Sequence, residues 1–263
     1  MKKFIYILIP VFLASFTVIF YLVSASGNDA NTVSLLHMDG TDAATSFPDC
    51  AAGSSHSWTA NGNAQIDTAQ SEFGGASGLF DGTGDYLTTA DSSDWDFGTG
   101  DFTIDGWVRI PNTTGGTVIG HNEGVNGEWE VYVNGANNYL AFEGSFTDAT
   151  AIQVRNTSNP IALNTWTHFA IVRSSNTLTM YASGTPNGTQ DATGKTLNMI
   201  PTGGIGIGAR NAGTSLYNGW IDELRVSKGI ARWTAAFDPP TEAYTGACGG
   251  GMPRPSDDMI VFE

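Results

Sequence analysis

The sequence predicts an all-β protein built as a two-sheet antiparallel sandwich, and three observations predict it. Short stretches in which apolar and polar residues alternate recur along the chain, separated by clusters of Gly, Asn, Asp and Pro. The 33 glycines indicate many tight turns, because glycine reaches positive φ at little cost. No long stretch of helical periodicity follows the first 26 residues, so about a dozen short strands must supply the core.

Residues 1–26 form a separate hydrophobic segment. Lys2 and Lys3 precede an uncharged apolar run from Phe4 to Val23. Val23 and Ala25 fit the −3 and −1 positions of a signal-peptide cleavage site. The run is also nearly long enough to span a bilayer. We therefore expect an N-terminal signal or anchor helix, either cleaved or retained in the membrane, and a secreted or cell-surface protein.

The charge balance excludes one class of partner. The chain has 26 acidic and 11 basic residues, for a formal charge of −15. Cleavage after residue 25 would remove two lysines and leave 9 basic against 26 acidic residues, or −17. Such a surface repels phosphate backbones, so no nucleic-acid partner is expected. It suits calcium, basic partners or neutral sugars, or it serves only to keep an exported protein soluble.

The stretch Asp101–Ile110 shows the strand pattern most clearly. Phe102, Ile104, Val108 and Ile110 fall on one face. The other face carries Thr103, Asp105, Trp107 and Arg109. One face is therefore expected in the core and the other outside it.

A hairpin and further strands are predicted on both sides of this stretch. Trp166–Arg173 and Thr177–Tyr181 flank a short polar turn, as in a β-hairpin. The main domain is expected over residues 31–246, followed by a Gly/Pro-rich tail over residues 247–263. The other strand candidates are Ser34–Met38, Ala64–Thr68, Gly78–Phe80, Tyr86–Thr88, Val118–His121, Trp129–Val133, Tyr139–Phe142, Ile152–Arg155, Ile205–Ala209 and Trp220–Val226.

Cys50 and Cys248 predict one disulfide. Two thiols in an exported protein are expected to pair, which would tie the first loop of the domain to the C-terminal tail.

Five runs in sequence order carry a family resemblance: Leu35-Leu-His-Met-Asp-Gly40, Phe73-Gly-Gly-Ala-Ser-Gly-Leu-Phe-Asp-Gly-Thr-Gly-Asp-Tyr-Leu87, Asp101-Phe-Thr-Ile-Asp-Gly-Trp107, Trp166-Thr-His-Phe-Ala170 and Gly219-Trp-Ile-Asp-Glu-Leu-Arg-Val226. In this order and spacing the chain resembles bacterial laminin-G-like domains of the concanavalin A-like lectin/glucanase superfamily, over roughly residues 33–245. The resemblance implies a jelly roll with one concave and one convex sheet. It implies less about function, because one fold hosts many functions.

The resemblance also implies a structural calcium near the start of the domain and its last strand. The matching positions are Asp39 and Asp222, with Asp81 or a carbonyl near Gly82 as further ligands. Carboxylates and carbonyls from separate loops are the ligands that calcium prefers. In the alternative, Asp39 and Asp81 only shape turns before glycine, and Asp222 pairs with an arginine.

Sugar binding on the concave face or its rim would use aromatic rings to stack on pyranose rings, and polar groups to orient the hydroxyls. The candidates on expected loops or exposed faces are Glu128, Trp129, Tyr132, Asn134, Asn138, Tyr139, Arg210, Asn211 and Tyr217. Each aromatic ring in this set has packing in the core as its alternative.

No enzyme activity is expected. Glucanases of the superfamily place three acids on one strand, whereas Glu128 and Glu130 supply two and Val133 stands at the third position. The expected function is a non-catalytic module that binds a glycan, a surface polysaccharide or another surface protein. The alternatives are a structural or adhesive protein that assembles through protein–protein contacts, and a divergent glycoside hydrolase.

Overall fold

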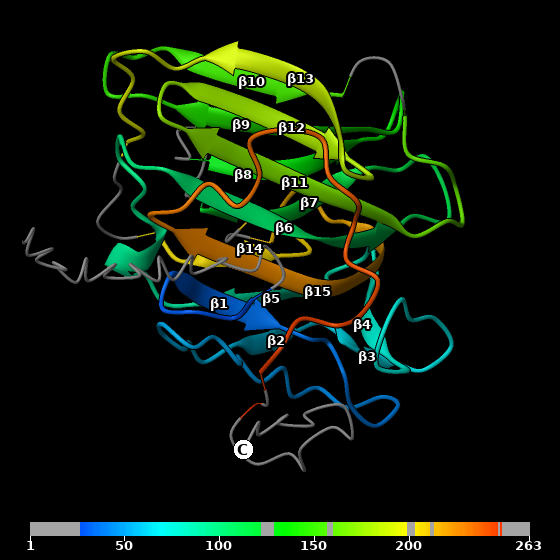
Figure 1. The fold of residues 1–263 in the computed structure, drawn as a ribbon. Coiled ribbons are helices and arrows are strands. Elements are labelled where there is room, and N and C mark those ends of the chain that lie inside the picture. Colours follow the sequence, from blue (N-terminus) through cyan, green and yellow to red (C-terminus); the bar gives the residue numbers. More distant parts are fainter. Residues whose placement is uncertain are drawn as a thin grey trace, which may run out of the picture.

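The computed structural model describes residues 27–121, 129–156, 160–198, 203–210, 213–246 and 248. Within these ranges the chain forms β-strands and one 3-10 turn, Ser93–Trp95, and no helix is long and apolar enough to cross a membrane. The strands form two antiparallel layers, which confirms the predicted sandwich (Figure 1). The predicted leader and the tail beyond Cys248 lie outside the described ranges.

Sheet A contains eight of the described strands. Their order is β13-β12-β11-β6-β15-β4-β3, and β1 pairs with β15 beside this path. The bounds are β1 Thr32–Leu36, β3 Gln65–Asp67, β4 Ser77–Asp81, β6 Phe102–Arg109, β11 Thr167–Ser174, β12 Thr177–Ala182, β13 Thr185–Asp191 and β15 Asn218–Lys228.

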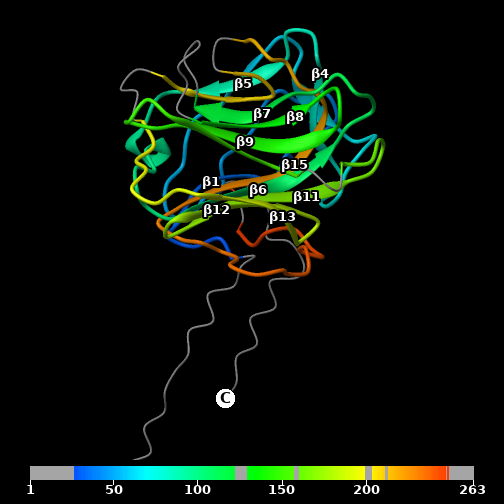
Figure 2. The same cartoon turned by 90° about the horizontal axis from the view of Figure 1, so that it is seen from above.

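Sheet B contains the other seven described strands, in the order β10-β9-β8-β7-β14-β5-β2. Figure 2 shows the two sheets as stacked layers. The bounds are β2 Thr59–Asn61, β5 Tyr86–Thr89, β7 Gly116–His121, β8 Trp129–Asn134, β9 Tyr139–Ser145, β10 Ala151–Arg155 and β14 Ile205–Ile207.

Strand β6 lies inside sheet A and follows the predicted alternation. Phe102, Ile104 and Val108 are buried between the sheets, and Phe102 stacks on Phe97 with the ring centroids 4.3 Å apart. The residues between them point to the outer face, as the period of two requires. Trp107 is one of these outward residues, so it is buried on the outer face of sheet A and not in the core between the sheets.

The predicted hairpin is present as β11 and β12. The two strands pair antiparallel from Phe169 with Ala182 to Ser174 with Thr177, and Ser175 turns the chain with a φ of 53°. Strand β13 was not predicted from the sequence. Its residues are half-buried or exposed, so it carries little of the apolar alternation that indicates a strand.

A segment that we call the C-terminal cover, residues 229–246, crosses the outer face of sheet A (Figure 1, orange). Trp233 packs there against Ala170, Val172 and Tyr181 of sheet A, with Phe237 beside it. The close approach depends on Gly184, because a Cβ at this position would lie 1.8 Å from the carbonyl oxygen of Phe237. The cover therefore buries an apolar strip on the outer face of sheet A.

Arg225 of β15 is fully buried beneath the same cover. Its guanidinium donates to both carboxylate oxygens of Asp105, each at 3.0 Å, and lies 4.0 Å from the ring centroid of Tyr244. The hydroxyl of Tyr244 donates to Asp105. Burial disfavours the charged carboxylate, but Arg225 and His168 outweigh this effect and hold the pKa of Asp105 below its ordinary value.

A bulge in β15 separates the acidic neighbours of Arg225. The pairing with β6 shifts register between Asp222 and Arg225, and Glu223 has a φ of 49°. Glu223 accepts from the backbone N–H of Tyr244 at 2.9 Å and lies at the same distance from Nδ1 of His37. Glu223 and Arg225 of the same strand therefore bind different partners.

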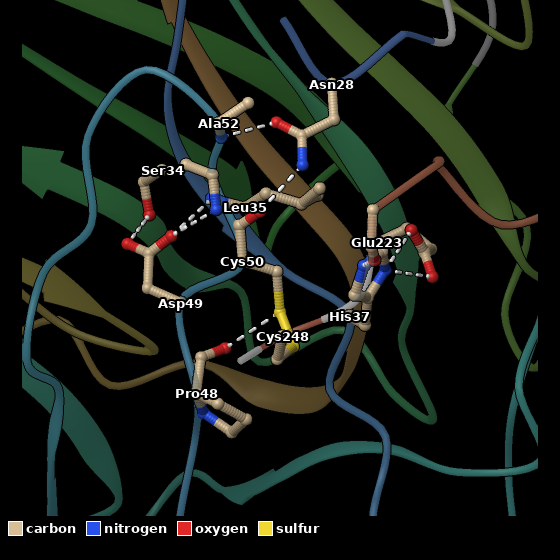
Figure 3. Close-up of a disulfide and its surroundings, with 12 residues drawn as sticks. Asn28, Ser34, Leu35, His37, Pro48, Asp49, Cys50, Ala52, Glu223 and Cys248 are labelled. Carbon is tan, nitrogen blue, oxygen red and sulfur yellow. Dashed lines mark hydrogen bonds and ion pairs between the residues drawn. A yellow bond between two sulfur atoms is a disulfide. The ribbon is translucent and has the colours of Figure 1, made fainter. Parts of the chain in front are cut away.

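The predicted disulfide joins Cys50 to Cys248 and closes a sequence separation of 198 residues (Figure 3). It lies beside His37, whose Nε2 is 2.9 Å from the carbonyl oxygen of Gly246. Asn28 donates to the carbonyl of Cys50 at 2.7 Å and accepts from the N–H of Ala52 at 2.7 Å. The two ends of the described domain are thus fixed next to each other on the outer side of sheet A.

Replacement of Asp105 by Asn should destabilise the chain strongly, because Arg225 would keep its charge in a buried site without a carboxylate. We expect the free energy of unfolding to fall by about 3–5 kcal/mol. Urea unfolding followed by tryptophan fluorescence measures this loss. The control is Asp148→Asn, which removes an exposed ion pair with Lys195 and should leave the midpoint unchanged. Equal midpoints for the two variants would contradict the dependence of Arg225 on Asp105.

Candidate functional site

The two outer faces of the sandwich differ in access. The C-terminal cover lies against sheet A, on the side away from sheet B (Figure 2). On sheet B, the outward side chains of several strands are half-buried or exposed, including Tyr86, Tyr132, Glu143 and Arg155. We therefore take the outer face of sheet B as the candidate ligand face.

An ion pair lies near the middle of this face. Arg210 donates to both carboxylate oxygens of Glu130, at 3.0 and 2.6 Å, and Thr117 adds a hydroxyl donor at 3.0 Å. Glu130 is only 5% exposed. Its carboxylate is therefore held in place by neighbouring donors, and Arg210 is engaged as its partner.

Tyr132 lies beside this pair in a polar cluster. Its hydroxyl accepts from the side-chain amide of Gln153 at 2.6 Å, and Gln153 also donates to Glu143 at 3.3 Å. Burial, followed by the negative charges of Glu143 and Glu130, raises the pKa of Tyr132. This half of the face is charged, and its polar groups largely bind one another.

Trp129 and Tyr217 are not exposed platforms, so the prediction that places them on the ligand face is wrong. Both are buried between the sheets. Trp129 donates from its indole N–H to the carbonyl of Trp95 at 3.2 Å. The hydroxyl of Tyr217 donates to a main-chain carbonyl oxygen of Arg109, and burial raises its pKa. Trp129 falls on the inward side of β8, and Tyr217 lies directly before β15 with its ring between the sheets.

The asparagine candidates shape the turn between β8 and β9. Asn134 accepts from the N–H of Ala136 at 3.1 Å, and Asn138 has a φ of 54° while its carbonyl accepts from Ile161. Tyr139 is half-buried at the start of β9, opposite Asn134. Glu128 and Asn211 lie outside the described residues.

A hollow of about 680 Å³ opens at the other half of the face, over β2 and β5. None of its lining residues was predicted from the sequence as a ligand-binding residue, and Tyr86 and Thr88 were predicted only as part of a strand. The outward position of Tyr86 and Thr88 on either side of buried Leu87 is the signal that could have found them. Its lining includes Thr59, Asn61, Tyr86, Thr88, Asp91 and Gly204.

Asp39 and Asp222, the two principal calcium candidates, lie close enough for their charges to interact, and Asp222 stands on the outer face of sheet A opposite Trp107. Oδ2 of Asp222 accepts from the N–H groups of Glu72 and Phe73 at 2.9 and 3.0 Å, while its buried Oδ1 has no hydrogen-bond partner among the described residues. Burial raises the pKa of Asp222 to about 8, and the charges of Glu223 and Asp39 add to this. A Cβ at Gly74 would lie 1.8 Å from Oδ1 of Asp39, so the loop lies directly against that carboxylate.

Asp81 and Gly82 do not join this pair. Asp81 pairs with Asn218, whose side-chain amide donates to the Asp81 carbonyl at 2.7 Å. Asn218 and Asp222 are four residues apart on β15, which places Asp81 about 13 Å along the strand from Asp222. Oδ1 of Asp81 accepts from the N–H of Thr83 at 2.6 Å, as expected of a turn residue.

One other group of metal-type side chains occurs among the described residues. A ligand atom of His37 and the sulfurs of Cys50 and Cys248 lie within 4.8 Å of one another. The two sulfurs are joined in the disulfide, so they are not thiolates and this group does not form a metal site.

Residues 81–232, more than half of the chain, match the family described as the concanavalin A-like lectin/glucanases superfamily. The chain belongs to this superfamily. The match confirms the resemblance seen in the five sequence runs, and it covers the candidate ligand face from β5 to β14. No curated protein matches the chain in sequence.

Solved structures of the same fold include toxin domains. The binding domain of Paraclostridial Mosquitocidal Protein 1 is 16% identical, with a TM-score of 0.58 over 77% of this chain and 50% of that one. The botulinum neurotoxin serotype G binding domain is 16% identical, with a TM-score of 0.57 over 77% and 49%. The receptor binding domain of botulinum neurotoxin D is 13% identical, with a TM-score of 0.59 over 80% and 51%. The chain thus spans about half the length of these structures, and the likeness is one of fold.

In this member of the superfamily, the two acids considered for glycoside hydrolysis are not seen together. Glu130 is bound to Arg210, and Glu128 lies outside the described residues. The acid that does lie opposite Glu130 is Glu143 on β9, which is hydrogen-bonded to Gln153. This superfamily member therefore shows a polar, ion-paired face around Glu130.

In EDTA, the stability of the chain should fall as the pH rises from about 4 to about 8. Burial raises the pKa of Asp222 in the folded chain to about 8, well above its ordinary value, so the folded chain binds this proton more tightly than the unfolded chain. The contribution is complete below the unfolded pKa and is lost as the pH approaches the folded pKa. Thermal unfolding at about pH 5 and about pH 8 measures the difference.

Asp222→Asn should reduce this pH dependence, and Asp81→Asn, a change at an exposed turn, is the matched control. An equal pH dependence in Asp222→Asn and in the original chain would contradict the assignment to Asp222.

Proposed function

We propose that the chain is an exported, non-catalytic binding module that recognises a glycan or a surface polysaccharide through the outer face of sheet B. The observation that carries the proposal is the difference between the two outer faces. The C-terminal cover buries Trp233 and Tyr244 against sheet A, whereas sheet B leaves Tyr86, Tyr132 and polar side chains accessible. An open face with aromatic rings and orienting polar groups is the composition that sugar recognition requires.

The comparisons support a binding role in general terms. The superfamily includes lectins, and the similar solved structures are described as binding or receptor-binding domains of toxins. A fold that serves recognition in those proteins is compatible with recognition here, while the ligand must come from this chain's own face.

The contacts of Glu130 favour binding over hydrolysis. A retaining glycosidase needs a nucleophile and a separate acid that can donate its proton to the leaving group. Both oxygens of Glu130 accept from Arg210, so this residue is an ion-pair partner in the described structure. The same contacts make Arg210 and Glu130 parts of the framework of the face.

Export is supported by two independent features. The sequence of residues 1–26 has the order of a signal or anchor segment. The disulfide between Cys50 and Cys248 belongs to a compartment in which disulfides persist. We therefore place the module outside the cytoplasm, secreted or held at the surface by its leader.

A structural calcium at Asp39 and Asp222 is part of the proposal. The charge of Asp39 acts on the buried carboxylate of Asp222, and Oδ1 of Asp222 lacks a hydrogen-bond partner among the described residues. A hard divalent cation would neutralise the repulsion and take carboxylate oxygens as ligands. Such an ion would join the loop around Phe73 and Gly74 to β15, and its role would be structural because it lies on sheet A.

A glycan array probed with the purified chain, once in calcium and once in EDTA, tests the function. We expect specific spots in calcium that weaken in EDTA, because loss of the ion would loosen the fold. In calcium, the Asp39→Asn variant should give the same weakened glycan spots as the original chain gives in EDTA.

A blank array with a folded chain would overturn the glycan proposal and favour a protein partner. Equal spots in calcium and EDTA would leave sugar recognition standing and remove the calcium from it.

A further inference from the structure

We propose that the hollow over β2 and β5 is the principal sugar subsite and that it takes a neutral pyranose. This inference rests on the proposed function, but it assigns different residues from those predicted by sequence. Its volume of about 680 Å³ lies within the range of about 300–1,000 Å³ typical of small-molecule sites. The hollow therefore has room for a sugar ring and part of its neighbour.

Asn61 and Thr88 present a fixed pair of polar groups in the hollow. The side-chain nitrogen of Asn61 donates to the hydroxyl of Thr88 at 3.2 Å and also lies 3.2 Å from the carbonyl of Thr59. These bonds orient the amide so that its oxygen is the acceptor it offers to a ligand. Because the Thr88 oxygen accepts from Asn61, its own hydrogen remains a donor. An acceptor beside a donor matches two neighbouring sugar hydroxyls.

Tyr86 supplies the ring for stacking. It pairs with Asn61 across the β2–β5 ladder and is half-buried, so its ring stands on the face without filling the hollow. Gly213 lies against one side of the ring, since a Cβ there would lie 3.1 Å from two of its carbon atoms. Contact on that side limits the rotation of the ring. A held aromatic ring beside orienting polar groups is the arrangement that binds a pyranose.

Asp91 sets the charge of the hollow. Among the described residues that line it, Asp91 alone is charged. Its Oδ1 lies 3.1 Å from Nε2 of His121, a buried side chain that also contacts the carbonyl of Gly203. Both of these neighbours are acceptors, so Nε2 carries the proton and lies between the carboxylate and the Gly203 carbonyl. A fixed carboxylate in a chain of charge −15 repels uronic and sialic acids and leaves neutral sugars as ligands.

The Tyr132 half of the face lacks this combination. The polar groups there are already engaged, with Arg210 on Glu130 and Gln153 on both Tyr132 and Glu143. A sugar on that half would have to break charge-assisted contacts before forming its own. The groups that the hollow offers, the amide oxygen of Asn61 and the hydroxyl hydrogen of Thr88, require no such exchange.

The test uses the full chain and saturation-transfer NMR with maltotriose, cellotriose, mannotriose and chitotriose as neutral probes and trigalacturonic acid as the charged one. We expect transfer to at least one neutral probe and none to trigalacturonic acid. Tyr86→Ala should weaken the neutral probe at least about tenfold through loss of stacking. Thr88→Val keeps the side-chain shape and should weaken it about two- to tenfold through loss of one donor. Asp91→Asn should allow trigalacturonic acid to bind.

Tyr132→Ala is the matched control on the other half of the face and should leave the affinity unchanged. Neutral binding that survives Tyr86→Ala but is lost in Tyr132→Ala would overturn this inference and leave the glycan function intact. Preference for trigalacturonic acid would overturn the neutral class. Failure of every sugar, on the array as well as in the NMR experiment, would remove the function and this subsite together. Near-ultraviolet circular dichroism of each variant confirms that its fold is unchanged.

Discussion

Arg225 carries a full positive charge in a position without solvent access, and much of the structure on that side of the molecule accommodates it. Asp105 neutralises this charge, and the carbonyl oxygen of Gly27 accepts a hydrogen bond from the guanidinium at 2.9 Å. The ring of Tyr244 covers the flat face of the guanidinium. A buried charge is tolerated only when such partners are all present. The start of the domain, β6, β15 and the C-terminal cover therefore have to be assembled together around one guanidinium.

The bulge at Glu223 makes this assembly possible. In a regular strand, Asp222 and Leu224 would share one face, and Glu223 and Arg225 would share the other. The extra residue instead places Arg225 opposite Asp105 and lets Asp222 and Glu223 reach different loops. One backbone irregularity thus separates the candidate ion site from the covered ion pair. Because the outer face of sheet A makes these interactions, the outer face of sheet B is the more accessible of the two.

Strands with a clear alternation of apolar and polar residues could be predicted from the sequence. Contacts between segments that are far apart in the sequence could be predicted less well. The alternation in Asp101–Ile110 was enough to assign the two faces of β6, and the polar turn at Ser175 was enough to assign the hairpin. Strand β13 was missed, since an exposed edge strand needs no apolar face.

How well the site residues could be predicted depended on the family resemblance and on whether each side chain is buried. Resemblance placed Asp39 near Asp222, but it could not show that Asp81 pairs with a different part of β15. Trp129 and Tyr217 were assigned to the surface because residue type alone does not tell whether a side chain points to the core or to solvent. The hollow was not predicted because β2 and β5 are separated in the sequence and become neighbours only by pairing in the folded sheet.

The disulfide and the adjacent ends also determine how the domain responds to mechanical force. If residues 27 and 248 are pulled apart, tension passes from residue 27 to Cys50 and then directly across the sulfur atoms to Cys248. The stretch under tension is 23 residues (50 minus 27), which can extend by no more than about 80 Å. The 198-residue loop, with all of sheet B and the ligand hollow, stays outside the force path. Sheet B would therefore keep its structure while the 23 residues before Cys50 are stretched.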